Sequence, residues 1–275
     1  MIDRELIKKA LAEDLAGGQD ITSVATLSGN EQVIADYVAR KDGVIAGLEM
    51  AKATLEEVGV HEIELKVHDG DSVKAGQVLM SVHGSARAIL YAERTSLNFL
   101  GHLSGIATLT HTWVHAVAGT KCKVRDTRKT TPGYRALEKY AVRMGGGVNH
   151  RMSLSDAALI KDNHIAAAGG VSAAFEKVRA QFPEVETEIE VDTLEQLNEV
   201  LPLQPSLVLL DNMTPDQCKA AVALVNGAVK LEASGGITLE NARAYAESGV
   251  DYIAVGALTH SAPVLDIGLD IRLEK

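Results

Sequence analysis

The sequence predicts an α/β protein in which an incomplete parallel α/β barrel of about six strands follows an N-terminal α+β sandwich domain. First, short β-branched runs alternate with amphipathic helical stretches in the C-terminal part, the pattern of right-handed βαβ units. Second, each of these runs ends in a polar or glycine-bearing turn. Third, the N-terminal third instead mixes helices with strands of alternating apolar residues. We place the sandwich at residues 1–105 and the barrel at residues 106–265.

The N-terminal domain is expected to contain helices at residues 3–15 and about 48–58, and a strand at 32–40. Two further strands follow in residues 61–70 and 73–82 and are separated by the turn DGDS. The stretch DGDSVKAGQVLMSVHG resembles the half-barrel hairpin of lipoyl and biotinyl carrier domains. A carrier needs a lysine beside an apolar methionine at an exposed hairpin tip, and none stands there. We therefore interpret the hairpin as scaffold.

A long helical stretch, interrupted by glycines, is predicted over residues 85–119. Its apolar residues recur every three or four positions, so most of it should lie in the core. His111 and His115 share one helix face, but no glutamate follows His111 as it does in the HExxH zinc motif. We predict no metal site there.

The barrel is expected to contain six strands, separated mostly by helical stretches. The strand runs are 121–127, 157–163, 187–192, 206–211, 229–236 and 251–257. The helical stretches are 169–182, 193–201, 214–225 and 238–249.

Composition and charge exclude several classes of protein. The formal net charge of −10 argues against nucleic acid or an anionic membrane as the main partner. No apolar run approaches the ~18 residues that a membrane-spanning helix needs, and the charged N-terminus does not resemble a secretory signal. Cys122 and Cys218 are far apart without a CxxC pair, which favours a reducing, cytoplasmic location.

Positive charge is concentrated between Lys121 and Arg151. This segment has nine basic and two acidic residues, so it carries +7 in a chain of net charge −10. It includes the loop-like sequences DTRKTTPG and RMGGGVNHR, and loops often hold ligands. A small, strongly anionic ligand such as a phosphate or a polycarboxylate would suit such a cluster.

The carboxyl ends of the predicted strands carry charged or glycine-rich sequences. In α/β barrels these ends form the active-site face, and the last loops commonly bind phosphate. An Asp after a strand is often only a helix N-cap, but six such ends converge here by topology. They carry, in chain order, Arg125, Asp126, Arg128, Lys129, Lys161, Glu190, Asp192, Asp211, Ser234–Gly236 and Gly256.

Several sequence blocks resemble the quinolinate phosphoribosyltransferase family. The most specific are DTRKT, NHR and LIKDNH; AERTSLNFLGHLSGIAT, EIEVDTLEQL, LVLLDNM and LEASGGITLENARAYAESGVDYIAVGALTHSAP extend the resemblance over essentially the whole chain. Tyr134 and Ser153 stand where the family pattern has Leu and Gly, and neither is a charged ligand position.

The resemblance implies transfer of phosphoribosyl from phosphoribosyl pyrophosphate to quinolinate (pyridine-2,3-dicarboxylate) with decarboxylation. The products would be nicotinate mononucleotide, pyrophosphate and CO2, as in de novo NAD biosynthesis. It also implies Mg²⁺ and a homodimer, with a C-terminal tail of about residues 266–275 returning to the sandwich.

Site residues follow from the resemblance position by position. Arg128 and Arg151 would bind the dicarboxylate with help from His150 and Thr127, while Arg94 would reach in from the partner chain. Lys129 and Lys161 would neutralise pyrophosphate, and Glu190 and Asp211 would hold the ribose hydroxyls and Mg²⁺, directly or through water. The 5′-phosphate cradle would comprise Ser234, Gly235, Gly236, Val255, Gly256 and Ala257. Lys129, Lys161, Glu190 and Asp211 are the candidate catalytic residues.

Other functions stay open at this point. Lys161 could form a Schiff base in an aldolase-like barrel, although two arginines that can each bind a carboxylate are surplus for that chemistry. A relative with another aromatic acid as substrate, the related protein of molybdenum-transport systems, and a non-catalytic phosphosugar-binding or carrier-like module are the remaining alternatives.

Overall fold

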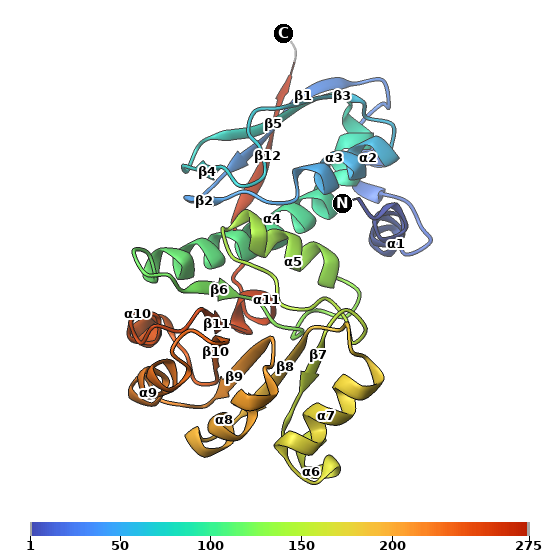
Figure 1. Cartoon of the computed structure of the whole chain (residues 1–275). Coiled ribbons are helices and arrows are strands. Elements are labelled where there is room, and N and C mark those ends of the chain that lie inside the picture. The colour runs from blue at the N-terminus through green and yellow to red at the C-terminus, as the bar shows by residue number, and fades with distance from the viewer. Residues whose placement is uncertain (1, 274–275) are drawn as a thin grey trace. The chain divides into compact units, whose positions relative to one another are not determined.

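The computed structural model describes residues 2–273, which form two compact units (Figure 1). Of these residues, 2–111, 137–146 and 261–273 form the first unit, and 112–136 and 147–260 form the second. The chain therefore contributes three separate segments to the first unit. Both units contain the predicted architecture: an antiparallel sheet with helices in the first, and six parallel strands with helices in the second.

The first unit is built on a four-stranded antiparallel sheet in the order β12-β1-β5-β3. The strands are β1 (Gln32–Ala39), β3 (Glu62–Leu65), β5 (Val78–Ser85) and β12 (Ile267–Leu273), with a small ladder of β2 (Gly43–Val44) and β4 (Ser72–Val73) beside it. Along β1, the buried side chains of Val33, Ala35 and Tyr37 alternate with more exposed ones, so one face of the strand belongs to the core. The buried Tyr37 hydroxyl forms a hydrogen bond with Ser96 Oγ at 2.6 Å. The carrier-like hairpin is part of this sheet because β5 pairs with both β1 and β3.

The C-terminal strand β12 forms the edge of this sheet and pairs with β1 in antiparallel register. Two ion pairs link these parts of the chain: Arg272 with Asp36 at 2.8 Å, and Arg40 with Asp270. Both pairs reach the surface, where ion pairs contribute at most about 1 kcal/mol each, so they favour this strand register more than they add stability.

The helices of the first unit are α1 (Arg4–Leu15), α2 (Ile21–Thr26), α3 (Leu48–Glu57), most of α4 (Ala86–Ala116) and most of α5 (Arg135–Met144). The prediction that glycines interrupt the fourth helix is wrong, because α4 is one continuous helix. Its glycines instead allow close approach: a Cβ on Gly105 would collide with the carbonyl oxygen of Pro263, and one on Gly101 would lie 2.9 Å from Val264 Cγ1.

The second unit contains the six predicted strands as one parallel sheet in the order β6-β11-β10-β9-β8-β7 (Figure 1). They are β6 (Lys123–Arg125), β7 (Ala158–Ile160), β8 (Thr187–Val191), β9 (Leu207–Asp211), β10 (Lys230–Ser234) and β11 (Tyr252–Ala254). All five residues of β8 are buried, as expected where helices cover a parallel sheet. Strands β6 and β7 stand at the two edges of this order, which makes the barrel incomplete.

Helices alternate with these strands, as the sequence predicts. They are α6 (Asp162–Ala168), α7 (Val171–Gln181), α8 (Leu194–Val200), the 3₁₀ turn η1 (Leu201–Leu203), α9 (Pro215–Val225), α10 (Leu239–Glu247) and α11 (Ala257–His260). Thr193, Thr214 and Thr238 begin α8, α9 and α10 with reciprocal capping boxes, in which the side chain three residues later bonds back to the cap. Such caps define where each strand-to-helix turn ends and so fix the loops at the carboxyl edge of the sheet. Within residues 2–273, none of the helices combines the length and apolar character needed to span a bilayer.

Candidate active site

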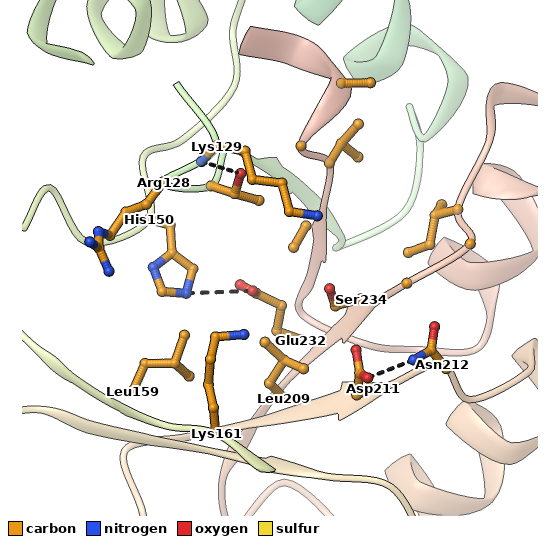
Figure 2. A pocket seen from close by; sticks show the side chains of 18 of the residues that line it. Arg128, Lys129, His150, Leu159, Lys161, Leu209, Asp211, Asn212, Glu232 and Ser234 are labelled. Carbon is orange, nitrogen blue, oxygen red and sulfur yellow. Dashed lines mark hydrogen bonds and ion pairs between the residues drawn. The ribbon is translucent and has the colours of Figure 1, made fainter. Parts of the chain in front are cut away.

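A cavity of about 700 Å³ opens at the carboxyl ends of the parallel strands in the second unit (Figure 2). Its walls bring together thirteen residues that the sequence predicts for the site: Thr127, Arg128, Lys129, His150, Arg151, Lys161, Asp211, Ser234, Gly235, Gly236, Val255, Gly256 and Ala257. The lining also includes Leu159, Leu209, Asn212, Glu232, Ile237, Ala254 and His260. Residues from strands far apart in the sequence thus surround one volume, because parallel strands all end at the same edge of the sheet.

Lys161 and Glu190 form an ion pair at this edge. Lys161 follows β7 and Glu190 lies on the neighbouring β8, and Lys161 Nζ is 3.0 Å from Glu190 Oε2. The Glu190 side chain is nearly buried, whereas half of the Lys161 side chain is exposed. Asp211 stands at the end of the next strand; burial, and then the charges of Glu190 and Asp192, raise the pKa of its carboxyl. These carboxylates concentrate negative charge at one side of the mouth, where hydroxyl groups or a hard cation could bind.

Positive charge is concentrated at Arg128 and Arg151, which both line the cavity. Burial and the nearby charge of Arg128 lower the pKa of the Arg151 guanidinium. Arg151 Nη1 donates to the Ala157 carbonyl at 2.9 Å, which orients this side chain. The Nε of Arg128 is buried without a hydrogen-bond partner in the part of the chain that the structure describes. Two guanidinium groups that repel each other in a partly desolvated site favour an anionic ligand, and their planar forks suit carboxylates.

The third part of the cavity is a set of tight turns after β10 and β11. Gly235 and Gly236 have φ angles of +87° and +63°, which side-chain-bearing residues rarely adopt. A Cβ on Gly235 would collide with Oδ1 of Asn212, and a Cβ on Gly256 would lie 3.0 Å from Lys129 Cδ. The turns are therefore shaped so that a ligand can approach the backbone N–H groups, as in phosphate-binding nests.

A largely buried ionic cluster connects His150 with Glu188, Glu232 and Arg125. His150 Nε2 is 2.8 Å from Glu188 Oε2 and 3.6 Å from Glu232 Oε1, and Arg125 Nη1 is 2.6 Å from Glu232 Oε2. The other ring nitrogen, Nδ1, accepts from the Arg151 backbone N–H at 2.7 Å. Because Nδ1 is an acceptor, the ring proton belongs on Nε2, facing the two carboxyl groups.

The ligand atoms of His150, Glu188 and Glu232 all lie within 4.8 Å of one another, a spacing that a metal ion could use. However, a histidine whose Nε2 carries the proton has no lone pair there for a metal. We therefore assign Glu188 in this cluster to positioning His150 and Arg151 rather than to binding a metal.

Sequence reasoning missed Glu188 and Glu232 because it examined only the strand ends. A signal was present nevertheless: in TEIEV, Glu188 and Glu190 are two residues apart, so both project from the same face of β8. A charged residue inside an otherwise apolar, buried strand must have a partner. His260 and Asn212 were also missed, and both line the cavity.

Two predicted residues do not line the cavity. Glu190 lies beside it and forms an ion pair with the lining residue Lys161. Arg94 is an exposed residue of α4 in the first unit.

The two departures from the family pattern, Tyr134 and Ser153, both lie in turns. Ser153 donates to Asp156 Oδ1 from its backbone N–H at 2.9 Å and from its hydroxyl at 3.1 Å, which ties down the loop after Arg151. The Tyr134 backbone N–H closes a turn onto Thr131 at 3.0 Å.

Comparison with known proteins agrees with this arrangement. Residues 20–104 match the family model of the quinolinate phosphoribosyl transferase N-terminal domain, and residues 106–270 match that of the C-terminal domain. The chain is 54% identical to a nicotinate-nucleotide pyrophosphorylase [carboxylating] of Mycobacterium leprae over 98% of this chain and 96% of the relative. It is 43% identical to a probable nicotinate-nucleotide pyrophosphorylase [carboxylating] of Bacillus subtilis, over 98% and 93% of the two chains.

Solved structures are also similar over nearly the whole chain. The structure of NadC from Streptococcus pyogenes has a TM-score of 0.94 and 37% identity, with 99% of this chain and 97% of that chain covered. The nicotinate-nucleotide pyrophosphorylase of Francisella tularensis has a TM-score of 0.94 and 38% identity, with 98% and 95% covered. Together, the two family models and these full-length similarities show that the chain belongs to the quinolinate phosphoribosyltransferase family.

Proposed function

We propose that this chain transfers phosphoribosyl from phosphoribosyl pyrophosphate to quinolinate with decarboxylation, giving nicotinate mononucleotide, pyrophosphate and CO2 for NAD biosynthesis. The observation that carries this proposal is that Arg128 and Arg151 share one cavity with Lys129, Lys161 and the glycine turns. A dicarboxylate and a phosphorylated sugar could therefore bind side by side. The names of the full-length relatives support the same reaction.

The acid-binding part comprises Arg128, Arg151 and Thr127. The two guanidinium groups bind the two carboxylates of quinolinate, the Thr127 hydroxyl offers a further hydrogen bond, and together they orient the pyridine nitrogen toward the ribose. His150 helps to hold Arg151 in place, because its Nδ1 accepts a hydrogen bond from the Arg151 backbone N–H while its Nε2 faces Glu188. Most of the catalytic effect at this step comes from positioning, which can supply about 7–11 kcal/mol in favourable cases.

The donor-binding part comprises the glycine turns for the 5′-phosphate, and Lys129 and Lys161 for pyrophosphate. Glu190 and Asp211 hold the ribose hydroxyls. They also suit Mg²⁺, because carboxylate oxygens are hard ligands and because crowding by Glu190 and Asp192 helps to raise the pKa of Asp211. When bound, Mg²⁺ would neutralise negative charge on pyrophosphate.

Departure of pyrophosphate leaves an oxocarbenium-like ribose centre, which the pyridine nitrogen attacks. The lysines stabilise the negative charge that develops on the leaving group, and the carboxylates stabilise the positive charge on the ribose. Once the ring nitrogen is alkylated and cationic, it can accept electron density as the neighbouring carboxylate leaves as CO2. No protein nucleophile is required.

Assembly and location belong to the same proposal. The family resemblance supports a homodimer in which Arg94 of one chain completes the acid-binding part of the other, and Arg94 is exposed on α4 as such a role requires. A reducing, cytoplasmic setting is supported by Cys122 and Cys218, which are both buried free thiols.

The test is turnover of the purified protein with phosphoribosyl pyrophosphate, Mg²⁺ and either quinolinate or nicotinate. Nicotinate lacks only the 2-carboxylate, so it would leave buried cations unmatched. We expect at least about a 10³-fold lower kcat/KM for nicotinate, on the scale seen when a site loses a required polar partner. Comparable use of both acids would show that the second carboxylate is not what Arg128 and Arg151 recognise, and absence of turnover with either acid would refute the proposed function.

A further inference from the structure

Glu232 places a buried carboxyl group in the wall of the cavity. Its residue lies on β10 with 0% of its surface exposed, yet it is part of the cavity lining. Oε2 accepts from Arg125 Nη1 at 2.6 Å, whereas Oε1 has no hydrogen-bond partner among residues 2–273. Figure 2 shows this carboxyl directed toward the His150 ring. A fully buried carboxyl oxygen without a partner is costly unless it meets a ligand or carries a proton.

The groups around Glu232 explain where a proton would lie. Glu188 on β8, Arg125 on β6 and His150 before β7 face it. The His150 Nε2–H points to Glu188 Oε2, because that distance is 2.8 Å against 3.6 Å to Glu232 Oε1. Glu188 Oε2 thus accepts the hydrogen bond from His150, and Oε2 of Glu232 accepts from Arg125. Two buried carboxyl oxygens, Glu188 Oε1 and Glu232 Oε1, have no hydrogen-bond partner among residues 2–273, and burial raises the pKa of both carboxyls to about 7. Only Glu232 of these two lines the cavity, so its Oε1 is the position from which a proton could reach a bound ligand.

Charge and burial favour that protonated form. Burial, and then the neighbouring Glu188 charge, raise the pKa of Glu232 to about 7, while Arg125 and His150 oppose the shift. A carboxylic acid with such a pKa can hold a proton near neutral pH and still release it, which is the property of a general acid.

The proposed reaction requires one proton that none of the assigned residues supplies. When the bond between C2 and its carboxylate breaks, CO2 leaves and the electron pair stays on C2 beside the cationic ring nitrogen. That carbon must gain a proton to give nicotinate mononucleotide.

We propose that Glu232 is a catalytic residue that donates its Oε1 proton to C2 in the decarboxylation step. This inference rests on the proposed function. The new C–H bond forms with the electron pair left by CO2, and Glu232 becomes a carboxylate held by Arg125. A proton from solvent restores the acid after the product leaves, so each turnover consumes one proton.

Single-turnover experiments can separate this step from phosphoribosyl transfer. Enzyme in excess over quinolinate is mixed with phosphoribosyl pyrophosphate and Mg²⁺, and released pyrophosphate and CO2 are measured in the same samples. The variant is Glu232→Gln, which keeps the size of the side chain but has no acidic proton. The matched control is Glu188→Gln, because Glu188 has a similar burial and also faces His150 but does not line the cavity.

In Glu232→Gln, we expect pyrophosphate release to continue while CO2 release slows by at least about 10²-fold, the lower end of general acid catalysis. The ribosylated but still dicarboxylated pyridine should then accumulate. In Glu188→Gln, both steps should slow together because His150 and Arg151 lose support. Equal rates of pyrophosphate and CO2 release in Glu232→Gln would overturn the inference. If the wild-type protein itself formed no pyrophosphate, the proposed function would fail instead.

A second measurement does not depend on whether the variant folds. In the wild-type protein, the acid form of Glu232 is lost as pH rises through about 7, so the rate of CO2 release should fall relative to pyrophosphate release between pH 7 and 9, by up to about tenfold per pH unit. A ratio that stays constant over this range, together with a Glu232→Gln variant that does not fold, would also reject the role of Glu232 as proton donor.

Discussion

Lys161 Nζ donates to Glu190 Oε2 at 3.0 Å across the neighbouring strands β7 and β8. Each residue is proposed to contact a different part of the donor: Lys161 the pyrophosphate, and Glu190 the ribose hydroxyls and Mg²⁺. The ion pair therefore holds both groups in place before the donor binds, and it keeps the largely buried Glu190 charge neutralised.

Replacing Glu190 should weaken binding of the donor with its metal. In Glu190→Gln, we expect the Mg²⁺ concentration for half-maximal activity to rise by about tenfold or more, because one anionic oxygen is lost. Activity at varied Mg²⁺ and calorimetric binding of phosphoribosyl pyrophosphate would measure this. Glu176→Gln is the matched control, since Glu176 is an exposed carboxylate on α7, away from the carboxylates at this edge. An unchanged Mg²⁺ dependence in Glu190→Gln would remove Glu190 from the metal site.

The planar shape of Arg128 should matter beyond its charge. In Arg128→Lys, we expect kcat/KM for quinolinate to fall by about tenfold or more, or about 1.4 kcal/mol, because an ammonium cannot form the paired hydrogen bonds of a guanidinium. Steady-state kinetics would give the value, and Arg179→Lys, on the exposed part of α7, is the control. Near-normal kinetics for Arg128→Lys would exclude Arg128 from carboxylate binding.

Subunit mixing can test whether Arg94 acts across a dimer. Arg94→Ala and Lys161→Ala homodimers should each be inactive. In a mixed dimer, one site would carry both substitutions and the other site neither. Activity should then return to at most about half of the wild-type value per mixed dimer. If exchange is verified by native mass spectrometry and no activity returns, Arg94 acts in its own chain or has a structural role.

The Gly235 turn should be intolerant of a side chain because of its positive φ angle and because of the nearby Asn212 side chain. A pair of glycine variants separates these two effects. Gly235→Ala would impose strain at a φ of +87° and a collision with Asn212. Gly227→Ala has nearly the same φ, +81°, but no atom within 4 Å of the new Cβ. Both should lose about 1 kcal/mol of unfolding free energy through backbone strain, measured by urea denaturation. Only Gly235→Ala should also lose donor affinity, by about tenfold or more, since Asn212 and the phosphate turn must shift. Equal donor affinity in the two variants would argue against a phosphate site at Gly235.

Buried Glu232 should make the stability of the protein depend on pH. Its pKa is raised from 4.5 to about 7 by burial and by Glu188, so the folded state binds its proton more tightly than the unfolded state does. The resulting stabilisation is complete below about pH 4.5 and is lost as pH rises through about 7. The difference in pKa corresponds to a change of at most about 3 kcal/mol. Urea denaturation between pH 5 and 8 should show a smaller decrease for Glu232→Gln than for wild type, while Glu247→Gln, an exposed control, should match wild type. Identical pH profiles for wild type and Glu232→Gln would mean that Glu232 is ionised throughout.

The sequence by itself was sufficient to predict the strands of the barrel and the edge of the sheet at which the candidate site lies. The run SLVLLD is apolar enough to be buried on both faces, and the alternation of such runs with helices predicts a parallel sheet. The position of the polar strand-end side chains then followed from topology. Each helix leads the chain back to the start of the next parallel strand, so all the carboxyl ends lie at the same edge of the sheet. This is why eight of the predicted strand-end residues line one cavity, whereas the resemblance to the family supplied Thr127, His150, Arg151, Val255 and Ala257.

Only the tertiary structure shows which distant segments pack closely against the glycines of α4, and which groups face the buried charges of the barrel. Gly101 and Gly105 look like helix breaks, but α4 continues through them because the segment at Pro263 and Val264 packs directly on its backbone. Likewise, Glu188 and Glu232 are 44 residues apart and meet at His150 only because β9 separates their strands at a fixed spacing. Local patterns record which face of an element is buried, since that depends on the periodicity of the element itself. They do not record which distant group lies opposite a charge, because that depends on strand order and register across the whole sheet.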